Sequence, residues 1–401
     1  MDPLYLDTAR VGRMSPGAQA AHREFVALAG VEGGSAYLQR FLRHGTESLP
    51  AAVRDRYPAL ACWPGVSGLK RSLRQLAPGP ADLPVLLANR SAQLMRLAAR
   101  LLFHPCRRVL TCDLGWPAYH TILAVEASRG SRSVDTLPLR DEVLAGRLDD
   151  HGVVEAVADA YLRGGCDGLF LPAVSSLGVR LPVRRIVERI SAAAEVRMTV
   201  VDGAQDFCHT ECGLGPEHYD LYLAGCHKWL GAYQPLGLAF FGRRRSRSRV
   251  ETVLRDMTAR GGLDDPLLAF TRQLEANDLV PGGETVSLGA LLSCFGALGD
   301  VPRPANSLAK RLANLDPVAE VAAGAGWRCL TPAPGLQSGI VLARPRGVTD
   351  RGTDPVRTAE TLRERGVVAS TWPGGVVRLS LPDRRLGSVE LDCLGAAIAA
   401  V

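Results

Sequence analysis

Two ionisable side chains stand where short apolar segments end. The segment Met198–Val201 is followed by Asp202, and the segment Leu221–Leu223 leads through Gly225 to Lys228. A carboxylate at the tip of a buried strand is costly unless it meets a cation or a strong hydrogen-bond donor. A lysine between apolar neighbours is partly desolvated, which lowers its pKa and frees the amine as a nucleophile. The sequence therefore predicts a site that combines an acid with a reactive amine.

The composition narrows the choice of lysine. Only three of the 47 basic residues are lysines, and arginine cannot act as an amine nucleophile. Lys70 and Lys310 lie in amphipathic segments, GLKRSLRQL and LAKRLANL, and are expected on the surface. An acid for a pyridine nitrogen and a lysine for an aldehyde are what pyridoxal phosphate needs. The alternative from the residue types alone is an ordinary buried ion pair between Asp202 and Lys228.

The same stretch resembles a known family. VDGAQ (201–205) is similar to the acid-and-amide motif, and CHKWL (226–230) to the lysine motif, of the class V aminotransferase-like branch of fold type I pyridoxal-phosphate enzymes. That branch includes cysteine desulfurases, isopenicillin N epimerase-like proteins and ergothioneine-type carbon–sulfur lyases. YLDTA (5–9) is similar to the family's YLD-x-A opening. The resemblance implies an α/β fold with a large domain on a mostly parallel seven-stranded sheet, a small α/β domain, and a homodimer with shared active sites.

The resemblance also implies roles for single residues. Lys228 matches the lysine that forms a Schiff base with the cofactor and moves the α-proton. Asp202 matches the acid that keeps the pyridine nitrogen protonated, and Gln205 matches the group that hydrogen-bonds the ring oxygen. His227 matches the neighbour of the lysine, which is a phosphate ligand or a packing contact.

A phosphate needs backbone donors at a helix N-terminus, and residues 89–91 offer them between a strand and a helix. Their position matches the family's phosphate loop, so Asn89, Arg90 and Ser91 are predicted to bind the cofactor. Arg90 departs from the family's small residues; it either adds a cation to the phosphate or points away. An ordinary capped helix, with Ser91 near the cap, is the alternative.

Three further positions complete the cofactor site that the resemblance implies. Trp116 stands where the family has a ring-stacking residue, with Tyr119 as the alternative, because an indole stacks well on a pyridine. Ser176 follows a predicted strand, where the family has a polar residue that reaches the cofactor or the substrate. Thr285, in Gly282-Gly283-Glu284-Thr285, matches the threonine that reaches the phosphate of the other subunit; a plain glycine-rich turn is the alternative.

Arginine is the predicted ligand of the substrate. Arg378 matches the family arginine whose guanidinium forks onto the substrate carboxylate, a geometry that suits a two-pronged donor. A surface arginine on a strand is the alternative. Arg10 and Arg13 follow the YLDTA segment and are additional candidates for binding substrate charge.

Alternating apolar runs and helical patterns position these residues. From about residue 84 onward strands alternate with helices, which is typical of a largely parallel sheet whose functional groups lie at the carboxyl ends of the strands. The strands predicted for this part are Val85–Ala88, Val109–Cys112, Gly168–Pro172, Met198–Asp202, Leu221–Leu223 and Leu238–Phe241. The helices predicted along the chain are Ala18–Leu28 (ending at Gly30), Ala36–His44, Ala92–Leu102, Tyr119–Ser128, Val153–Leu162, Arg184–Ala194, Leu288–Leu298, Leu308–Ala323, Val356–Arg365 and Val389–Ala400. Strands Gly339–Ala343, Val367–Ser370 and Val376–Ser380 are predicted near the C-terminus.

We expect residues 1–60 to contribute to the small domain, 61–287 to form the large cofactor-binding domain and 288–401 the small domain.

Composition excludes several classes of protein. The chain has 401 residues, 47% of them hydrophobic, and a formal net charge of +6 that is spread along the sequence. No apolar run is long enough to cross a membrane, and the one basic run, GRRRSRSR (242–249), has no interleaved aromatic residues, so neither a membrane nor a nucleic-acid partner is predicted. The ten scattered cysteines and the absence of an export signal predict a cytoplasmic protein with reduced thiols. The Cys and His residues between 208 and 227 fit no standard zinc spacing, so no metal is expected.

These features predict an enzyme that acts on an α-amino acid. Between Leu330 and Asp392 the chain has no cysteine, so the usual chemistry of a cysteine desulfurase is not expected. Together with the CHKW motif this favours β-elimination of the carbon–sulfur lyase type, with an aminotransferase or an amino-acid epimerase of the same family as the alternative. The arginine-rich composition is typical of a GC-rich coding source, where such enzymes often serve specialised metabolism such as antibiotic biosynthesis. A non-catalytic, cofactor-binding regulator is disfavoured, because no separate DNA-binding module fits at either end.

Overall fold

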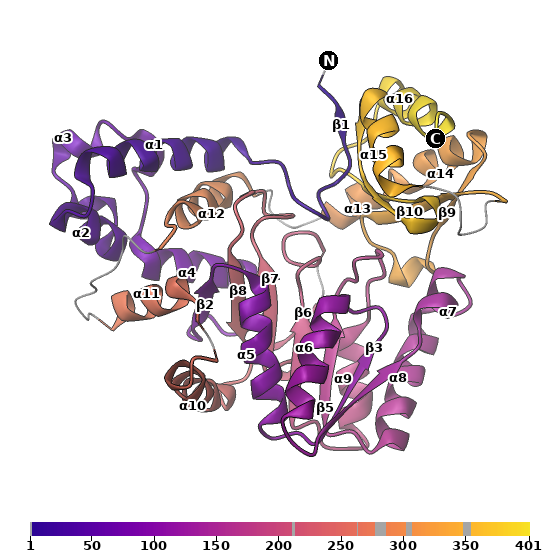
Figure 1. Ribbon diagram of the computed structural model, residues 1–401, viewed down its shortest axis with the longest axis horizontal. Helices are drawn as coiled ribbons and strands as arrows, with labels where there is room; N and C mark the ends of the chain where they lie inside the picture. The colour runs from indigo at the N-terminus through magenta and orange to yellow at the C-terminus, as the bar shows by residue number, and fades with distance from the viewer. Residues whose placement is uncertain (1, 211–212, 263, 277–285, 302–306, 348–353) are drawn as a thin grey trace.

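The architecture is described by a computed structural model that covers residues 2–210, 213–262, 264–276, 286–301, 307–347 and 354–401. Its centre is a seven-stranded sheet in the order β2-β8-β7-β6-β5-β3-β4 (Figure 1). All neighbouring strands are parallel except that β8 runs antiparallel to β2 and β7. The strands are β2 (Val85–Ala88), β3 (Arg108–Cys112), β4 (Ser133–Leu137), β5 (Gly168–Pro172), β6 (Met198–Asp202), β7 (Leu221–Gly225) and β8 (Gly237–Phe241).

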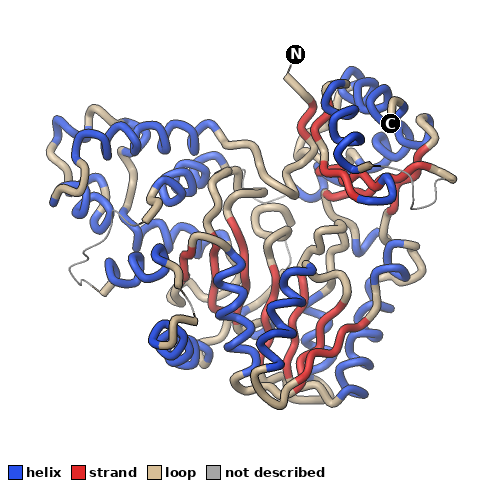
Figure 2. Tube along the Cα trace, viewed as in Figure 1, coloured by secondary structure: helices blue, strands red, loops and turns tan. Residues whose placement is uncertain are grey.

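Helices cover both faces of this sheet (Figure 2). Side chains alternate between the faces along each strand, so that Leu86 packs in one hydrophobic cluster and Val85 and Leu87 pack in another. The first cluster contains helices α5 (Ser91–Phe103), α6 (Pro117–Ser128) and α10 (Ser246–Ala259). The second contains α4 (Gly65–Leu76), α8 (Asp150–Gly164), α9 (Val183–Ser191), α11 (Pro266–Glu275) and α12 (Gly289–Asp300), with α7 (Arg140–Leu144) at its margin.

A smaller unit contains both ends of the chain (Figure 1). It has a four-stranded antiparallel sheet in the order β12-β13-β10-β9 and a short parallel pair, β1 with β11. The strands are β1 (Leu4–Tyr5), β9 (Trp327–Leu330), β10 (Ile340–Pro345), β11 (Val367–Val368), β12 (Ser370–Trp372) and β13 (Val376–Ser380). The helices are α13 (Ser307–Leu312), α14 (Leu315–Gly324), α15 (Pro355–Glu364) and α16 (Ser388–Ala399).

The packing differs from the predicted division into domains in two places. Helices α1 (Pro16–Glu32) and α2 (Ala36–His44), with the short α3 (Ala51–Arg54), join the large sheet rather than the small domain, since Phe25 and Phe41 lie in the same core as strand β2. Helix α12, predicted to begin the small domain, packs along α1 in that core (Figure 1). Amphipathic helices bury an apolar stripe on either sheet, so their pattern alone did not identify the partner.

All six strands predicted for the large domain form, and β2, β5 and β6 have the predicted bounds. The seventh strand, β4, was missed because it is a polar edge strand, SVDTL, without an apolar run. The predicted helix Leu308–Ala323 is split between α13 and α14, because Pro317 has no amide hydrogen and its ring would clash with the carbonyl of Ala313. Helix α1 continues past the predicted end at Gly30 to Gly33, which has a positive φ of 56°.

Candidate active site

A cavity of about 410 Å³ opens at the carboxyl edge of the large sheet, and we call it the central cavity. It is bounded by the segments that follow β3, β5, β6 and β7, by the start of α5, by residues 9–10 and by strand β13. In a parallel sheet this edge is where functional groups converge. Nine of the twelve predicted site residues line the cavity: Arg10, Ser91, Trp116, Ser176, Asp202, Gln205, His227, Lys228 and Arg378.

Asp202 ends β6 and is held in a largely apolar setting. Its side chain is only 6% exposed, and its Oδ1 accepts a hydrogen bond of 3.0 Å from the amide of Ala204. Among the described residues no other hydrogen bond reaches this carboxylate. Burial raises the pKa of Asp202, and the amide of Ala204 and the charge of Lys228 lower it. The second oxygen is therefore left for a donor that enters the cavity.

Lys228 follows β7 on a turn that is fixed by the N-terminal segment. The amide of Gly12 donates to the carbonyl of His227 at 2.8 Å, and a Cβ at Gly12 would lie 2.0 Å from the Lys228 carbonyl oxygen. Burial lowers the pKa of Lys228 to about 8, with the Asp202 charge opposing and the Arg378 charge adding to this shift.

The alternative of an ordinary ion pair does not hold. Within the described residues no hydrogen bond or ion pair joins Lys228 to Asp202, although both line the same cavity. Lys228 and Asp202 therefore face the central cavity as two separate groups.

Gln205 has its amide fixed at both ends. Its Nε2 donates to the carbonyl of Ala9 at 2.7 Å, and its Oε1 accepts from the indole Nε1 of Trp229 at 2.9 Å. The sequence indicated Gln205 as a cavity residue but gave no sign of either partner.

The N-terminus of α5 faces the cavity through Ser91 and Ala92, and the Ser91 hydroxyl accepts a 3.0 Å hydrogen bond from Tyr119. His227 lines the same region, and its Nδ1 is buried with no hydrogen-bond partner among the described residues. Burial, followed by the charges of Lys228 and Arg90, lowers the pKa of His227 to about 4. A neutral imidazole and an open helix end can both donate to an anion.

Two of the predicted phosphate ligands do not line the cavity. Both the backbone amide and the side-chain amide of Asn89 donate to the Asp265 carboxylate, which caps α11. Asn89 is therefore held to the start of α11 and is not among the residues that line the cavity, so its role as a phosphate ligand stays a prediction. Arg90 is the exposed N-cap residue of α5 and acts on the site through its charge on His227. Thr285, the third predicted residue outside the lining, lies outside the described residues.

Trp116 and Ser176 lie on the cavity wall. Trp116 is 48% exposed at the start of α6, so its ring is available to a ligand. The carbonyl of Ser176 accepts from Arg378 Nη1 at 3.4 Å. Its neighbour Ser175 instead accepts from the amides of Leu177 and Val179 and shapes the turn.

Arg378, in the middle of β13, is buried and already partnered. Its Nη2 donates to the Ser370 hydroxyl at 3.0 Å and lies 3.6 Å from Oδ1 of Asp7, and the Ser370 hydroxyl in turn donates to Asp7. Asp7 is a site residue that the sequence reasoning missed, although the YLDTA segment that it belongs to was noted. The signal available in the sequence was an acid directly after the apolar Leu6.

The other two arginine candidates, Arg10 and Arg13, lie in different places. Arg10 is exposed and lines the cavity, and its role in binding substrate stays a prediction. Arg13 points away: its Nη2 donates to the carbonyl of Pro3 at 2.8 Å, and its guanidinium carbon lies 4.9 Å from the centre of the Tyr5 ring.

The two remaining lysines behave differently from each other. Lys310 is exposed, as expected. The expectation for Lys70 is wrong: it is 4% exposed and pairs with Glu275 at 2.7 Å, which ties α4 to α11. A cation on an amphipathic helix is buried when a neighbouring helix supplies a carboxylate, and a single helical pattern cannot reveal that neighbour.

Among the described residues no group of three His, Cys, Asp or Glu side chains is arranged to hold a metal ion. Nor does any described helix have the length and hydropathy to cross a membrane.

Comparison with known proteins rests on structure alone. A scan against models of protein families found no match, and a search of curated sequences found none. Many solved structures match over almost the full chain. An aspartate aminotransferase of subgroup IV from Thermus thermophilus matches with 18% identity and a TM-score of 0.63, covering 98% of this chain and 97% of that one. The cystine C–S lyase C-DES, in complex with its product cysteine persulfide, matches with 13% identity and a TM-score of 0.68, covering 99% and 97%. The cysteine desulfurase CsdA from Escherichia coli matches with 15% identity and a TM-score of 0.66, covering 99% and 94%.

The chain therefore has the α/β fold of the fold type I pyridoxal-phosphate enzymes, and within that fold it is similar to class V aminotransferase-like structures. The predicted fold class is confirmed, including the mostly parallel seven-stranded sheet and the smaller second sheet.

Proposed function

We propose that the protein is a pyridoxal-phosphate-dependent enzyme that acts on an α-amino acid in the central cavity. The observation that carries this proposal is that Asp202 and Lys228, at the ends of neighbouring strands, line one cavity and do not bond to each other. The structural neighbours, two named as enzymes of sulfur-containing amino acids and one as an aminotransferase, support the same class of chemistry.

The residues present fit this cofactor in three respects. Asp202 keeps one carboxylate oxygen without a hydrogen bond among the described residues, and a protonated pyridine nitrogen is a suitable donor for it. The buried Nδ1 of His227 has no partner in the described chain, and the N-terminus of α5 opens beside it, which suits a phosphate. Lys228 supplies an amine whose lowered pKa suits reaction with an aldehyde.

Pyridoxal phosphate, when bound, supplies an aldehyde for amines and a protonated ring that withdraws electrons from the substrate's α-carbon. Lys228 is neutral in about half of the molecules near pH 8, so it can act as a nucleophile and accept the α-proton. Asp202 holds the proton at the pyridine nitrogen. Arg378 is kept in place by Asp7 and Ser370 and turns its remaining N–H groups to the substrate carboxylate, with Arg10 nearby at the cavity wall.

Within this class we propose β-elimination of the carbon–sulfur lyase type, in specialised metabolism. No cysteine is among the described residues that line the central cavity, so a persulfide-forming cysteine is not supported there. Loop residues 370–375 carry serine and threonine, and Ser370 is bonded to Asp7. Transamination or epimerisation is the alternative. The products separate the three: pyruvate with a thiol, a keto acid with a new amine, or a racemised amino acid.

We further propose that the enzyme is a cytoplasmic homodimer whose active sites are shared. This rests on the family resemblance and on Thr285, which matches the residue that reaches the partner's phosphate site. Measurement of the mass in solution, together with activity at dilution, tests it.

Borohydride reduction tests the cofactor assignment directly. The protein is loaded with pyridoxal phosphate, reduced, digested and mapped by mass spectrometry. The phosphopyridoxyl mass is expected on Lys228 and on neither Lys70 nor Lys310, and Lys228→Ala should carry none. An adduct on another lysine, or no adduct on the wild-type protein, contradicts the proposal.

A further inference from the structure

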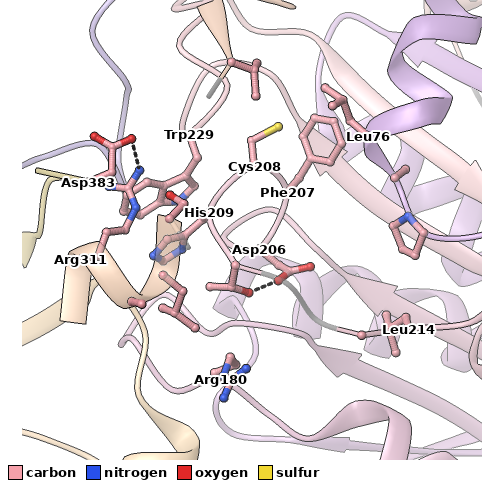
Figure 3. Close-up of a pocket in the computed structure, with 18 of the residues that line it drawn as sticks. Leu76, Arg180, Asp206, Phe207, Cys208, His209, Leu214, Trp229, Arg311 and Asp383 are labelled. Atoms are coloured by element: carbon pink, nitrogen blue, oxygen red, sulfur yellow. Dashed lines mark hydrogen bonds and ion pairs between the residues drawn. The ribbon is translucent and has the colours of Figure 1, made fainter. Parts of the chain in front are cut away.

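Gln205 is the end of a chain of contacts that crosses from the large domain to the small one. The indole of Trp229 donates to its amide oxygen, and the imidazole of His209 stacks on that indole at 3.6 Å between ring centres, with 10° between the planes. The guanidinium carbon of Arg311 also lies over the indole, 4.8 Å from the ring centre. Figure 3 shows Trp229, His209 and Arg311 together on one wall of a second cavity, of about 640 Å³. We call Trp229, His209 and Arg311 the aromatic brace.

The chemistry of the brace fixes which way the Gln205 amide points. An indole N–H can only donate, so the atom that faces Trp229 must be the amide oxygen. The carbonyl of Ala9 can only accept, so the atom that faces it must be the amide nitrogen. One N–H of Nε2 then remains without a partner among the described residues. Because Gln205 lines the central cavity, the amide offers a ligand there a donor.

Both the tautomer and the place of His209 are fixed as well. Its Nδ1 lies 2.6 Å from the carbonyl of Gln205, which only accepts, and its Nε2 accepts from the amide of Gly339 at 3.0 Å. The ring is therefore neutral, and burial holds its pKa well below the usual range. Gly339 precedes β10 of the small domain, and Arg311 Nη1 donates to the carbonyl of Leu381 at 2.7 Å. The indole is thus contacted by groups anchored in both domains.

We propose that Trp229 is a positioning residue that locks the Gln205 amide with its N–H toward the cofactor's ring oxygen, and that His209 and Arg311 hold the indole in place for this purpose. The inference rests on the proposed cofactor. A hydrogen-bond donor to an anionic oxygen favours the deprotonated form. The locked amide should therefore lower the pH midpoint at which the visible absorption band of the bound cofactor changes. Without the indole N–H only the Ala9 carbonyl still fixes the amide, so its N–H is held less strictly toward the cavity.

Trp229→Phe is the direct test, because phenylalanine keeps an aromatic ring beside His209 and Arg311 and removes the donor together with the pyrrole part of the indole. The pH midpoint of the visible band should rise by about 1–2 units, the equivalent of one hydrogen bond to a charged group. Trp63→Phe is the matched control: Trp63 is buried in the large-domain core, and its Nε1 donates to the carbonyl of Phe41 at 2.8 Å. The pH midpoint of the visible band in Trp63→Phe should equal that of the wild type.

A double-mutant cycle separates positioning from general disturbance. If Trp229 acts through Gln205, then Trp229→Phe should add nothing to the shift already caused by Gln205→Ala. If Trp229→Phe does not fold, β-(3-benzothienyl)alanine at position 229 replaces the N–H by sulfur at nearly the same shape. In the cofactor-free protein, the Trp229 indole N–H resonance should move in Gln205→Ala, while that of Trp63 stays.

Three results would overturn the inference: an unchanged midpoint in the variant without the N–H, an equal shift in Trp63→Phe, or a full additional shift in the Gln205→Ala background. These differ from a failure of the proposed function, which would appear as a wild-type protein that gains no visible band with pyridoxal phosphate. That result would overturn both, whereas a normal wild-type band with an unshifted variant removes only the role of Trp229.

Discussion

The ionisation of Lys228 can be measured without any substrate, because the chain has only three lysines. In the cofactor-free protein each amine is labelled competitively with a trace of an acylating reagent over a range of pH, and the lysine peptides are quantified by mass spectrometry. Only the neutral amine reacts. Lys310 is exposed and reports on the reagent, whereas Lys70 is enclosed with Glu275 and should label slowly.

The expected curve follows from the environment of the amine. With a pKa of about 8, roughly one tenth of the Lys228 side chains are neutral at pH 7 and roughly nine tenths at pH 9. The labelling rate of Lys228 should therefore rise about tenfold over these two units and then level off. A lysine with the ordinary value of about 10.5 would rise about a hundredfold over the same interval without levelling.

Two variants test the stated causes of the shift. Asp202→Asn removes the charge that favours the ammonium form, so the Lys228 midpoint should fall further. Arg378→Ala removes a like charge, so the midpoint should rise. A wild-type curve that still climbs above pH 9.5, or variants that move in the opposite directions, would refute the argument that burial and these two charges set the reactivity of Lys228.

Other consequences can be measured separately. Asp202→Asn should retain the cofactor yet lose turnover by on the order of a hundredfold, as judged by absorbance and steady-state rates, because the amide cannot hold the ring proton. Lys228→Met should raise the unfolding free energy of the cofactor-free protein by about 3 kcal/mol at pH 7, since the native state there binds a proton against its lowered pKa. In denaturant titrations that gain should shrink as the pH rises from about 8 toward 10.5, and a constant gain would contradict it. Arg378→Ala should lower kcat/KM by roughly ten- to hundredfold and Arg378→Lys by less; equal efficiency would move carboxylate binding to Arg10. Glu275→Gln should cost about 3 kcal/mol of stability and Lys70→Met less than about 1 kcal/mol, because an unpaired buried ammonium is worse than an apolar side chain of similar length.

The strands that are buried on both faces were predictable because local and global requirements coincide there. VLLA, GLFLP and MTVVD form strands with the predicted bounds, since each is a short apolar run buried on both faces of the sheet. Strand β4 could not be found in the same way. As an edge strand it is half exposed, and its sequence SVDTL has the polarity of a loop.

Some residues of the candidate site could likewise be predicted from the sequence, and others could not. Asp202, Gln205 and Lys228 belong to short motifs, and the fold brings them to one cavity because they follow adjacent strands. The prediction for Asn89 did not account for Asp265, which lies 176 residues away and binds the amide from the start of another helix. A motif identifies a residue type at a strand end, but a partner from a distant helix decides where that side chain points.

The buried side chains of Arg378 and Lys70 both show that a buried charge depends on a partner from a distant part of the chain. Arg378 and Asp7 lie 371 positions apart and meet because β13 and the N-terminal segment pack side by side, with the Ser380 amide donating to the Leu6 carbonyl at 2.7 Å. Lys70 and Glu275 meet across two helices in the same manner. A buried charge is tolerable only with its partner, so the sequence pattern of one element cannot distinguish a buried ion from a surface one. Arg378 can therefore be both structurally paired and a ligand for substrate only because a guanidinium has N–H groups to spare, which a lysine at that position would lack.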